Sequence, residues 1–280
     1  MTPLVSVICL CYNHERFVRD ALQSVIGQTY SPIELIVIDD FSTDRSVEII
    51  REFLVHHPSV KFIQLSENLG NCRAFNQGLA LAQGGYVIDL AADDMLTPKR
   101  VERGVAVFEP NPECGVQFSD AELIDETGLT IGFHSDKFPH ATIPSGMIFS
   151  KILARYFINS PTMMMRKSLL VELGGYDESL AYEDFDFWVR STPRAQYVYV
   201  PEPLIKRRVL TTSMGRQQYT TASAQQLSTF EVCKKALALC REREEYIALS
   251  KRIRYELRQA LRLGAWGLAW RYVKLWGKIF

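Results

Sequence analysis

Short apolar runs alternate with helix-like segments through the first part of the chain, and this alternation limits the fold more than any other feature. The runs are VSVICL (5–10), ELIVIDD (34–40), VKFIQL (60–65) and YVIDLA (86–91). The segments between them have apolar residues at helical spacing, at about 17–27, 47–53 and 71–82. Strands that alternate with helices form right-handed βαβ units, in which helices cover both faces of a parallel sheet. We therefore predict an α/β fold with a mainly parallel sheet.

The last part of the chain has a different pattern. From about Thr220 onward, apolar residues such as Phe230, Cys233 and Leu237 recur at helical spacing without strand-like runs between them. This change of pattern predicts a boundary after Gly215. It divides the chain into a domain of residues 1–215 and a helical C-terminal extension of residues 216–280.

The charge balance and the cysteines narrow the range of functions. Lys plus Arg and Asp plus Glu both number 32 among 280 residues, so the bulk charge does not indicate a nucleic-acid partner. The six cysteines form no CxxC pair and fit buried thiols better than a metal centre. The first residues lack the basic segment of a signal peptide, and no uncharged apolar run reaches the roughly 20 residues of a spanning helix. These features favour a cytoplasmic protein.

Two pairs of aspartates follow two of the predicted strands. Asp39 and Asp40 end the second run, and Asp93 and Asp94 come just after the fourth. In open parallel sheets, ligands bind beyond the carboxyl ends of the strands, near the point where the strand order reverses. If the first strand lies between the second and the fourth, both pairs face one crevice. Each pair could instead cap the turn or helix that follows it.

The loop after the first strand, CYNHER, contains no glycine. The phosphate-binding loops of dehydrogenases and P-loop proteins need glycines, because backbone amides must approach the phosphates there. A carboxylate beside the crevice could instead hold Mg²⁺ or Mn²⁺ together with substrate phosphates. Tyr12 in this loop could stack on a base or could simply pack as a loop aromatic.

Two further clusters carry charge. The segment YEDFDFWVR (182–190) places Glu183 and Asp184 beside aromatic residues, and a partly shielded aspartate at a helix start can act as a general base for a hydroxyl. The segment LIKRRV contains Lys206, Arg207 and Arg208, which could stabilise a departing diphosphate. The alternatives are a solvated helix start and a solvated charge run.

Taken together, segments 6–46, 67–94, 174–190 and 206–215 resemble, in order and spacing, the family-2 inverting glycosyltransferases of the bacterial surface-polysaccharide type. The resemblance covers about residues 4–215. It implies a GT-A fold, which is Rossmann-like, and transfer of a sugar from a nucleotide-diphosphate sugar to an acceptor hydroxyl with inversion. A UDP-sugar is the expected donor, and a glycan or lipid-linked molecule the expected acceptor. Such enzymes usually use a divalent metal, Mn or Mg.

The resemblance also assigns roles to individual residues. It places Tyr12 on the base of the nucleotide and Asp40 in a hydrogen bond with that base. It places Asn68 and Gly70 in the loop that closes over the nucleotide. The expected nucleotide-sugar site comprises Tyr12, Asn13, Asp40, Asn68, Gly70, Asp93, Asp94, Arg207 and Arg208, and the expected acceptor side comprises Glu183 and Trp188.

The catalytic assignments follow from the same resemblance, with three departures, one of which is Phe75, where many members have an arginine before the asparagine that Asn76 matches. Asp93 matches the metal-binding last acid of the family's DxD motif, and Asp184 matches the catalytic base. Ala91 stands where the first acid of that motif is expected, and Leu210 stands where relatives often have a histidine. The basic residues 206–208 could take over part of the charge neutralisation.

The C-terminal stretch LGAWGLAWRYVKLWGKIF (263–280) holds three of the four tryptophans together with Arg271, Lys274 and Lys278. As a helix, it places the three cations on a narrow stripe and leaves the rest mainly apolar, which is typical of helices in the interface of an anionic membrane. Such a helix would hold the enzyme on the inner face of the cell membrane. It could equally pack back on the domain or on a second subunit.

Two other classes of function are alternatives. A nucleotidyltransferase also holds Mg²⁺ with acids on a parallel sheet, but it needs a glycine-rich basic loop early in the chain, and CYNHER is not one. A non-catalytic nucleotide-sugar-binding module would explain Ala91 and Leu210. The presence of Asp93, Asp184 and the cationic cluster argues against that module.

Overall fold

A computed structural model describes residues 2–138, 142–210 and 223–279. In these residues, nine strands form one sheet, in the order β3-β2-β1-β4-β8-β6-β9-β5 with β7 paired to β6. The strands are β1 (Val5–Cys11), β2 (Ile33–Asp39), β3 (Lys61–Gln64), β4 (Tyr86–Ala91), β5 (Met95–Leu96), β6 (Cys114–Ile124), β7 (Thr130–Phe133), β8 (Met164–Arg166) and β9 (Gln196–Arg208). The helices are α1 (Val18–Ile26), α2 (Ser46–His56), α3 (Asn71–Leu81), α4 (Arg100–Phe108), α5 (Phe149–Ala154), α6 (Lys167–Glu172), α7 (Asp184–Ser191), α9 (Ala224–Leu239), α10 (Arg243–Arg262) and α11 (Trp266–Trp276).

The first half of the sheet is parallel and covered on both faces. Strand β1 lies between β2 and β4 and pairs with both in parallel register, and β2 pairs in parallel with β3. Every side chain of β1 is buried: Val7 and Cys9 face the core under α1 and α2, and Ile8 and Leu10 face the core under α3. Parallel strands that are buried on both faces read as continuous apolar runs, which is why the sequence pattern predicted them correctly.

The second half of the sheet mixes directions. Strand β8 is antiparallel to both β4 and β6, and β9 is parallel to β6. Two antiparallel steps restore the original direction, so β6 and β9 run the same way as β4. The carboxyl ends of β1, β2, β4, β6 and β9 therefore lie at one edge of the sheet. The predicted α/β fold is confirmed, with a mixed rather than purely parallel sheet.

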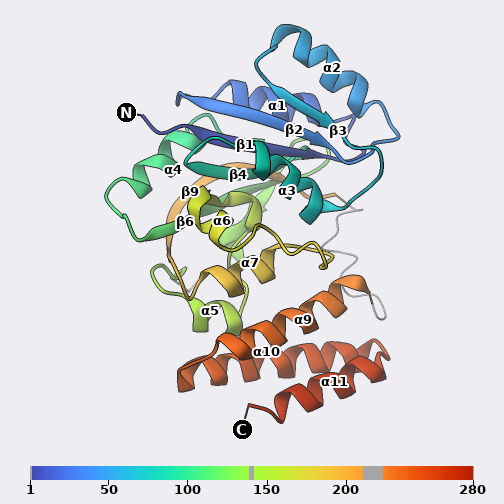
Figure 1. Cartoon of the computed structure of the whole chain (residues 1–280), viewed down its shortest axis with the longest axis vertical. Helices are drawn as coiled ribbons and strands as arrows, with labels where there is room; N and C mark the ends of the chain where they lie inside the picture. The colour runs from blue at the N-terminus through green and yellow to red at the C-terminus, as the bar shows by residue number, and fades with distance from the viewer. Residues whose placement is uncertain (1, 139–141, 211–222, 280) are drawn as a thin grey trace.

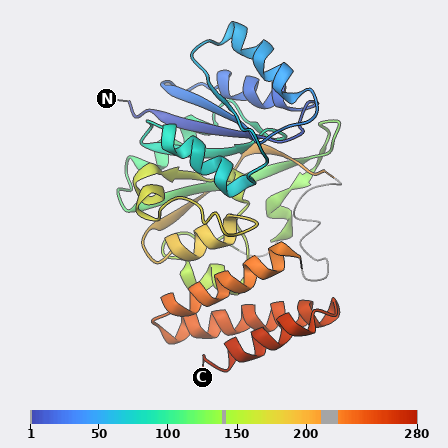
Figure 2. The ribbon, with the colours of Figure 1, turned by 45° about the vertical axis from the view of Figure 1, so that its right-hand side comes forward.

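Three helices, α9, α10 and α11, stack at one end of the molecule (Figures 1 and 2). They share a hydrophobic core with α3, α5 and α7, to which Cys233, Leu249 and Tyr272 contribute. A buried ion pair between Arg252 and Glu256 lies inside this core. The helical C-terminal extension is thus confirmed. The predicted boundary after Gly215 falls outside the described residues, and the division into two domains stays a prediction.

Helix α9 contacts the segment that leads into α7. The Lys235 ammonium lies 2.5 Å from an Asp186 carboxylate oxygen, and Arg190 lies 2.6 Å from the other. The Tyr182 and Thr229 hydroxyls are 2.6 Å apart, and Ser228 accepts a hydrogen bond from the Ala181 amide. Asp186 is fully buried, so its two cations are needed to balance its charge. The extension therefore fixes the start of α7, where Glu183 and Asp184 lie.

The structure also shows the state of the cysteines and the apolar character of the described helices. All six cysteines are free thiols and buried, as their apolar surroundings in the sequence suggested. Among the described helices, none combines the length and the apolar character that crossing a bilayer requires.

Candidate active site

The loops after β1 and β2 lie side by side at the carboxyl edge of the sheet, where the sequence predicts the ligand crevice. The Asp40 amide donates to the Cys11 carbonyl at 2.8 Å, which extends the ladder and sets Asp40 beside Tyr12. The Asn13 amide donates to Ser42 Oγ, and Asn13 Oδ1 accepts from the Thr43 amide at 2.8 Å. The two loops are therefore tied to each other, and strand β1 lies between β2 and β4 as the crevice prediction required.

Two residues of these loops have left-handed backbone conformations. Asn13 has φ 56° and Phe41 has φ 68°. Asparagine tolerates this region, whereas for a bulky residue such as phenylalanine it is strained and typical of functional sites. The side chains of Tyr12 and Phe41 are both nearly half exposed, at 46% and 45%. The two loops, which we call the aromatic wall, thus offer two aromatic side chains to a ligand, and only Tyr12 was identifiable from the sequence.

The Asp40 carboxylate holds the loop that precedes α3. Its Oδ1 accepts from the Leu69 amide at 2.7 Å, and its Oδ2 accepts from the Gly70 amide at 2.9 Å. Gly70 has φ 81°, a conformation that favours glycine, and Asn68 is exposed. Asp40, which is 6% exposed, therefore positions the 68–70 loop.

The Asp93–Asp94 pair is divided between two tasks. Asp94 is 3% exposed, and its Oδ1 accepts from the Arg208 amide at 2.8 Å. Burial and the neighbouring charge of Asp93 raise the pKa of Asp94 well above its usual range. Asp93 is half-buried, and its carboxylate makes no hydrogen bond with the described residues. The turn thus fixes Asp94 and leaves the Asp93 carboxylate available.

Arg208 is a structural brace, which corrects its predicted place in the nucleotide-sugar site. It is 6% exposed; its guanidinium donates to the carbonyls of Asp93, Asp125 and Glu126 and stacks 4.3 Å from the Phe17 ring centroid. All of these contacts are internal, so the side chain has no free face for a phosphate. The preceding Arg207 lies on the other side of the strand because side chains alternate along β9.

Arg207 is a half-buried cation near the carboxyl end of β9. No hydrogen bond or ion pair links its guanidinium to another described residue, and its charge lowers the pKa of both Asp184 and Asp94 against larger raising effects of burial. It therefore lies within electrostatic reach of the two acidic sides of the crevice. A guanidinium with unused donors is suited to a diphosphate.

Asp184 is the first residue of α7, and Glu183 precedes it. Asp184 Oδ1 accepts from the Phe185 amide at 2.6 Å. Burial, and then the charge of Glu183, raise the pKa of Asp184 to about 7, although the Phe185 amide and Arg207 oppose the shift. A carboxylate whose pKa lies near the working pH is suited to general base catalysis. The assignment of Asp184 as the base stays a prediction.

A third acid, Asp89, was not predicted. It lies within β4, and its Oδ2 accepts from the Tyr176 hydroxyl at 3.2 Å. Burial and the charge of Glu183 raise the pKa of Asp89 well above its usual range. Glu183 in turn accepts from Asn71 Nδ2 at 2.6 Å, at the start of α3. The sequence feature that could have identified Asp89 is its position as the one charged residue in the apolar run YVIDLA.

Trp188 is part of the core, which corrects its predicted place on the acceptor side. Its side chain is 2% exposed, and its Nε1 donates to Met163 Sδ at 3.3 Å. It lies in the middle of α7, where the successive residues 185–189 are all buried, whereas Asp184 is the first residue of the helix. Glu183 lies on the side of the predicted crevice assigned to the nucleotide, because it accepts a hydrogen bond from Asn71, which directly follows the 68–70 loop.

The residues that could hold a divalent metal are few. Within the described ranges, no group of three or more His, Cys, Asp or Glu side chains has the arrangement of a metal site. Asp93 supplies one uncommitted carboxylate, and Ala91 supplies none. Mg²⁺ and Mn²⁺ can be held by one or two carboxylates plus substrate phosphates. One carboxylate that makes no hydrogen bond with the described residues is therefore left to join substrate phosphates in holding such a metal.

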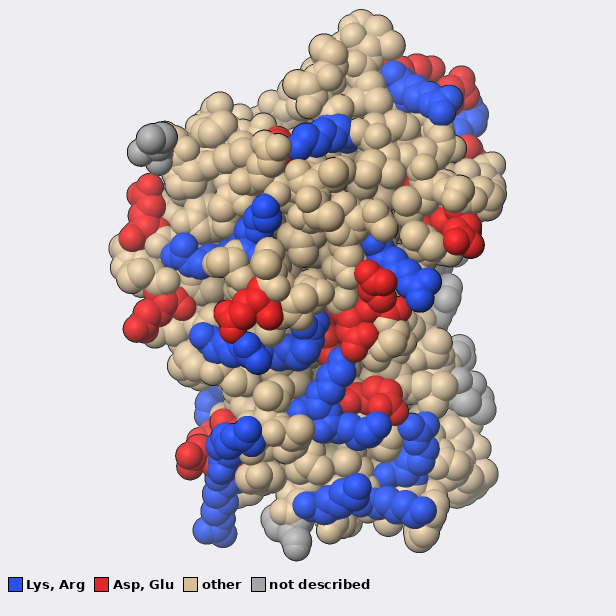
Figure 3. All heavy atoms as spheres, viewed as in Figure 1, with Lys and Arg blue, Asp and Glu red and all other residues tan. Residues whose placement is uncertain are grey.

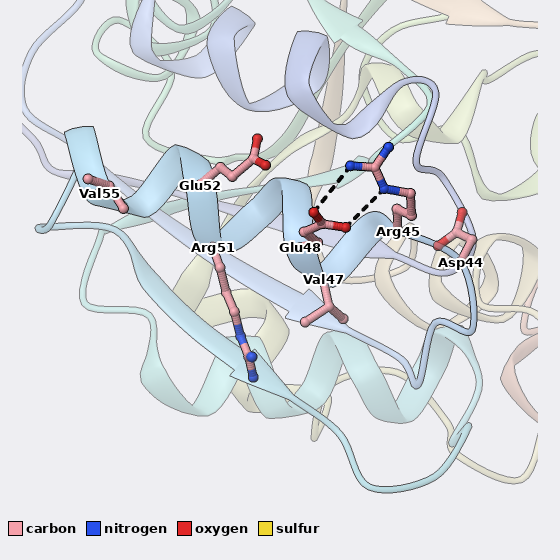
Figure 4. Close-up of a pocket in the computed structure, with 7 residues that line it drawn as sticks. All are labelled: Asp44, Arg45, Val47, Glu48, Arg51, Glu52 and Val55. Atoms are coloured by element: carbon pink, nitrogen blue, oxygen red, sulfur yellow. Dashed lines mark hydrogen bonds and ion pairs between the residues drawn. The ribbon is translucent and has the colours of Figure 1, made fainter.

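A separate hollow runs along the outer side of α2 (Figure 4). Its charged residues are already paired: Arg45 Nε lies 2.9 Å from Glu48, and Arg51 donates to Gln64. It is formed by one exposed helix and its N-terminal loop, and it contains none of the crevice acids. We assign it no function.

The fold and the acids at the carboxyl edge of the sheet can be compared with those of known proteins. The profile of the family described as "Glycosyl transferase family 2" matches residues 6–173. The chain is 30% identical over 217 residues to an uncharacterized glycosyltransferase of Methanocaldococcus jannaschii, covering 74% of this chain and 71% of the relative. It is 28% identical over 246 residues to a poly-beta-1,6-N-acetyl-D-glucosamine synthase of Staphylococcus epidermidis, covering 81% of this chain and 59% of that relative.

Solved structures share the fold. S. aureus TarS in complex with UDP-GlcNAc has a TM-score of 0.70 at 19% identity, covering 89% of this chain and 71% of that one. The mannosyltransferase PcManGT of Pyrobaculum calidifontis, in complex with GDP-Man and Mn²⁺, has a TM-score of 0.70 at 17% identity, covering 95% and 74%.

The chain belongs to glycosyl transferase family 2 and is a glycosyltransferase. The predicted family, fold class and enzyme class are thereby confirmed, and the nucleotidyltransferase and non-catalytic alternatives are set aside.

Proposed function

We propose that this glycosyltransferase moves a sugar from a nucleotide-diphosphate sugar to an acceptor hydroxyl with inversion at the anomeric carbon. The observation that carries the proposal is the environment of Asp184 at the start of α7. Burial and the charge of Glu183 raise the pKa of Asp184 to about 7, as a base for a hydroxyl needs. Arg207, which makes no hydrogen bond or ion pair with another described residue, is near enough for its charge to oppose this shift, and it can stabilise a departing anion.

The proposed reaction is a single in-line displacement. Asp184 accepts the proton of the acceptor hydroxyl while that oxygen attacks the anomeric carbon. The bond from this carbon to the diphosphate oxygen breaks, and its electron pair leaves with the nucleoside diphosphate. Arg207 stabilises the negative charge of the leaving group. A divalent metal held by Asp93 and the diphosphate would supply further charge neutralisation when bound.

The nucleotide is assigned to the aromatic wall. Tyr12 and Phe41 offer exposed rings to a base. Asp40 directly precedes Phe41, and its carboxylate holds the 68–70 loop beside this wall. Asn13 and Asp94 shape the two walls through their backbone and side-chain bonds. These contacts support the predicted nucleotide-sugar site without Arg208.

The donor and acceptor classes come from relatives. TarS binds UDP-GlcNAc and PcManGT binds GDP-Man with Mn²⁺, according to their structures, and one relative is a poly-N-acetylglucosamine synthase. We propose a UDP-sugar donor and a glycan or lipid-linked acceptor in surface-polysaccharide synthesis. We further propose a cytoplasmic enzyme that works on the inner face of the cell membrane, in contact with it through residues 263–280.

A donor-hydrolysis assay tests the proposed function. The purified chain is incubated with Mn²⁺ and a panel of UDP-, GDP- and dTDP-sugars, and nucleoside diphosphate and free sugar are measured. We expect UDP release from UDP-sugars. Release of pyrophosphate from a nucleoside triphosphate and a sugar phosphate would point to nucleotidyl transfer instead, and no turnover of any donor would contradict the proposal.

Asp93→Ala is expected to weaken Mn²⁺-dependent binding of UDP. Loss of a residue that only supports a metal ligand typically costs about 10–100-fold in metal affinity, so loss of the ligand itself should cost at least as much. Calorimetric titration with and without Mn²⁺ measures the effect. Glu113→Ala is the matched control, because this exposed acid precedes β6 and lies at the opposite edge of the sheet. Equal UDP affinity in Asp93→Ala and the unaltered chain would rule out the metal role.

A further inference from the structure

Helix α11 packs on the rest of the molecule through one side only. Its chain direction reverses after α10 at Gly264, which has φ 69°. Leu268, Tyr272 and Leu275 are buried in the shared core. Trp276 is tied to the neighbouring helix, since its Nε1 donates to Ser250 Oγ at 2.8 Å. The alternative of a helix packed back on the domain is therefore correct for this side of α11.

The opposite side of α11 exposes two tryptophans. Trp266 is 70% exposed, Trp270 is 60% exposed, and Val273 continues the row at positions i, i+4 and i+7. No described side chain covers them. The Lys274 ammonium lies 5.6 Å from the Trp270 ring centroid, so the row carries positive charge beside its aromatic surface. Exposed large apolar side chains grouped on one surface mark an interaction site.

The segment from the second turn of α10 to the end of the described chain is strongly basic. Residues 246–279 contain eight lysines and arginines and one acid, in a chain whose net charge is zero. The acid, Glu256, is buried and paired with Arg252, and Arg271 is paired with Glu231 at 2.9 Å. Six exposed cations make no ion pair with described residues: Lys251, Arg254, Arg258, Arg262, Lys274 and Lys278.

These cations form an ordered row on α10. Lys251, Arg254, Arg258 and Arg262 follow each other at spacings of three and four residues, so they lie on one side of the helix. Figure 3 shows Lys and Arg side chains gathered over the helices at the lower end of the molecule. We call the exposed sides of the neighbouring helices α10 and α11 together the basic–aromatic face, defined by these four residues with Trp266, Trp270, Val273, Lys274 and Lys278.

We propose that the basic–aromatic face binds the surface of a bilayer that contains anionic phospholipids. Indole rings are favoured at the level of the headgroups, and lysines and arginines near an anionic surface add attraction that salt screens. A double-stranded nucleic acid, whose bases are already stacked on each other, would use the cations alone and leave the two indoles in water. A membrane interface accommodates both.

The inference rests on the proposed function only in one respect: a lipid-linked acceptor would explain why the enzyme binds a membrane. The contact itself is inferred from the exposed residues of α10 and α11. It extends that function by assigning the contact to α10 as well as to the tail. It also removes Arg271 and Trp276 from the contact, because both are held by neighbouring helices.

Vesicle flotation of the full chain tests the inference. Vesicles are made of phosphatidylcholine alone or of phosphatidylcholine with phosphatidylglycerol. We expect flotation only with the anionic vesicles, loss of binding in 1 M salt, and a blue shift of tryptophan emission on binding. Lys251→Gln/Arg254→Gln/Arg258→Gln/Arg262→Gln and Trp266→Ser/Trp270→Ser should each lower the partition coefficient by about tenfold or more. Lys99→Gln/Arg103→Gln, which removes two exposed cations of the α4 region, should bind unchanged.

The outcomes separate this inference from the proposed function. All exchanged side chains are exposed, so the variants should keep their unfolding midpoints and their donor hydrolysis in the absence of vesicles. Hydrolysis without flotation would overturn the membrane inference alone. Flotation that persists in both face variants, or a face that instead mediates self-association in size-exclusion chromatography, would also overturn it. Flotation without hydrolysis would support the inference and contradict the proposed function.

Discussion

Replacement of Asp184 by asparagine is expected to slow sugar transfer by about 10²–10⁴-fold, the usual contribution of a general base. The amide cannot accept the hydroxyl proton. It can still accept the hydrogen bond from the Phe185 amide, so the start of α7 should keep its geometry. Donor binding should change little, because Asp184 contacts neither the aromatic wall nor the 68–70 loop through any described bond. Steady-state rates and calorimetric titration with UDP measure the two effects.

Folding of the Asp184→Asn variant provides its own control. Burial raises the pKa of Asp184, so its ionised form is disfavoured in the folded state. The folded protein then binds more protons than the unfolded chain between the two pKa values, and this group costs stability as the pH rises through that window. Asparagine removes the cost, so the unfolding midpoint at pH 8 should be equal or higher. A variant that turns over at the original rate would disprove the base assignment.

The same group should govern the pH dependence of transfer. Only ionised Asp184 can accept a proton, so kcat/KM should fall below about pH 7, where its pKa lies. Glu183→Gln removes the negative charge that helps raise this pKa, while its amide oxygen can still accept from Asn71. Its pH profile should therefore shift to lower pH. An identical midpoint in the variant would mean that another group controls the profile.

The crevice could be predicted because its parts follow from local patterns. Strands β1, β2 and β4 are apolar on both faces, and Asp40 and Asp93 come directly after two of them. The rule that carboxyl ends of parallel strands share an edge then brings the acids together. The order β2-β1-β4, which this step assumed, is the order found.

The prediction for the basic cluster differs from the structure at Arg208, because it treated Lys206, Arg207 and Arg208 as one charged group. In the structure they are successive residues of a strand. Period-two alternation along β9 separates Arg207 from Lys206 and Arg208. Lys206 lies 3.7 Å from Glu122, and Arg208 is buried against Phe17, which leaves Arg207 with no ion pair among the described residues. The alternation was available in the sequence, but the strand was not identified there.

Other features depend on partners far along the chain. Asp89 is recognisable as a site residue only beside Tyr176 and Glu183, which come about ninety residues later. The burial of Trp188 depends on Met163 and Tyr156 from a separate segment. Local patterns contain no information about such contacts, so the sequence predicted neither.

The link between the extension and the catalytic helix leads to the second large expected effect, a destabilisation of about 3–5 kcal/mol in Arg252→Met. The Arg252 guanidinium lies 3.7 Å from the Tyr156 ring centroid, and its Nε donates to the Leu153 carbonyl at 3.2 Å. The variant would leave Glu256 buried without its cation. Urea unfolding followed by tryptophan fluorescence measures the loss.

The matched control is Arg252→Met/Glu256→Leu, which removes both charges. Replacing a whole buried ion pair with apolar residues is often neutral, so the double variant should recover most of the lost stability. Arg252 also lies 5.4 Å from the ring of Phe185, the neighbour of Asp184. In urea, the loss of activity and the change in tryptophan fluorescence should therefore occur in one unfolding transition for every variant, because α9–α11 share a core with α7. Two separate transitions, with activity retained after the first, would instead show that residues 216–280 unfold as an independent domain and do not hold the base in place.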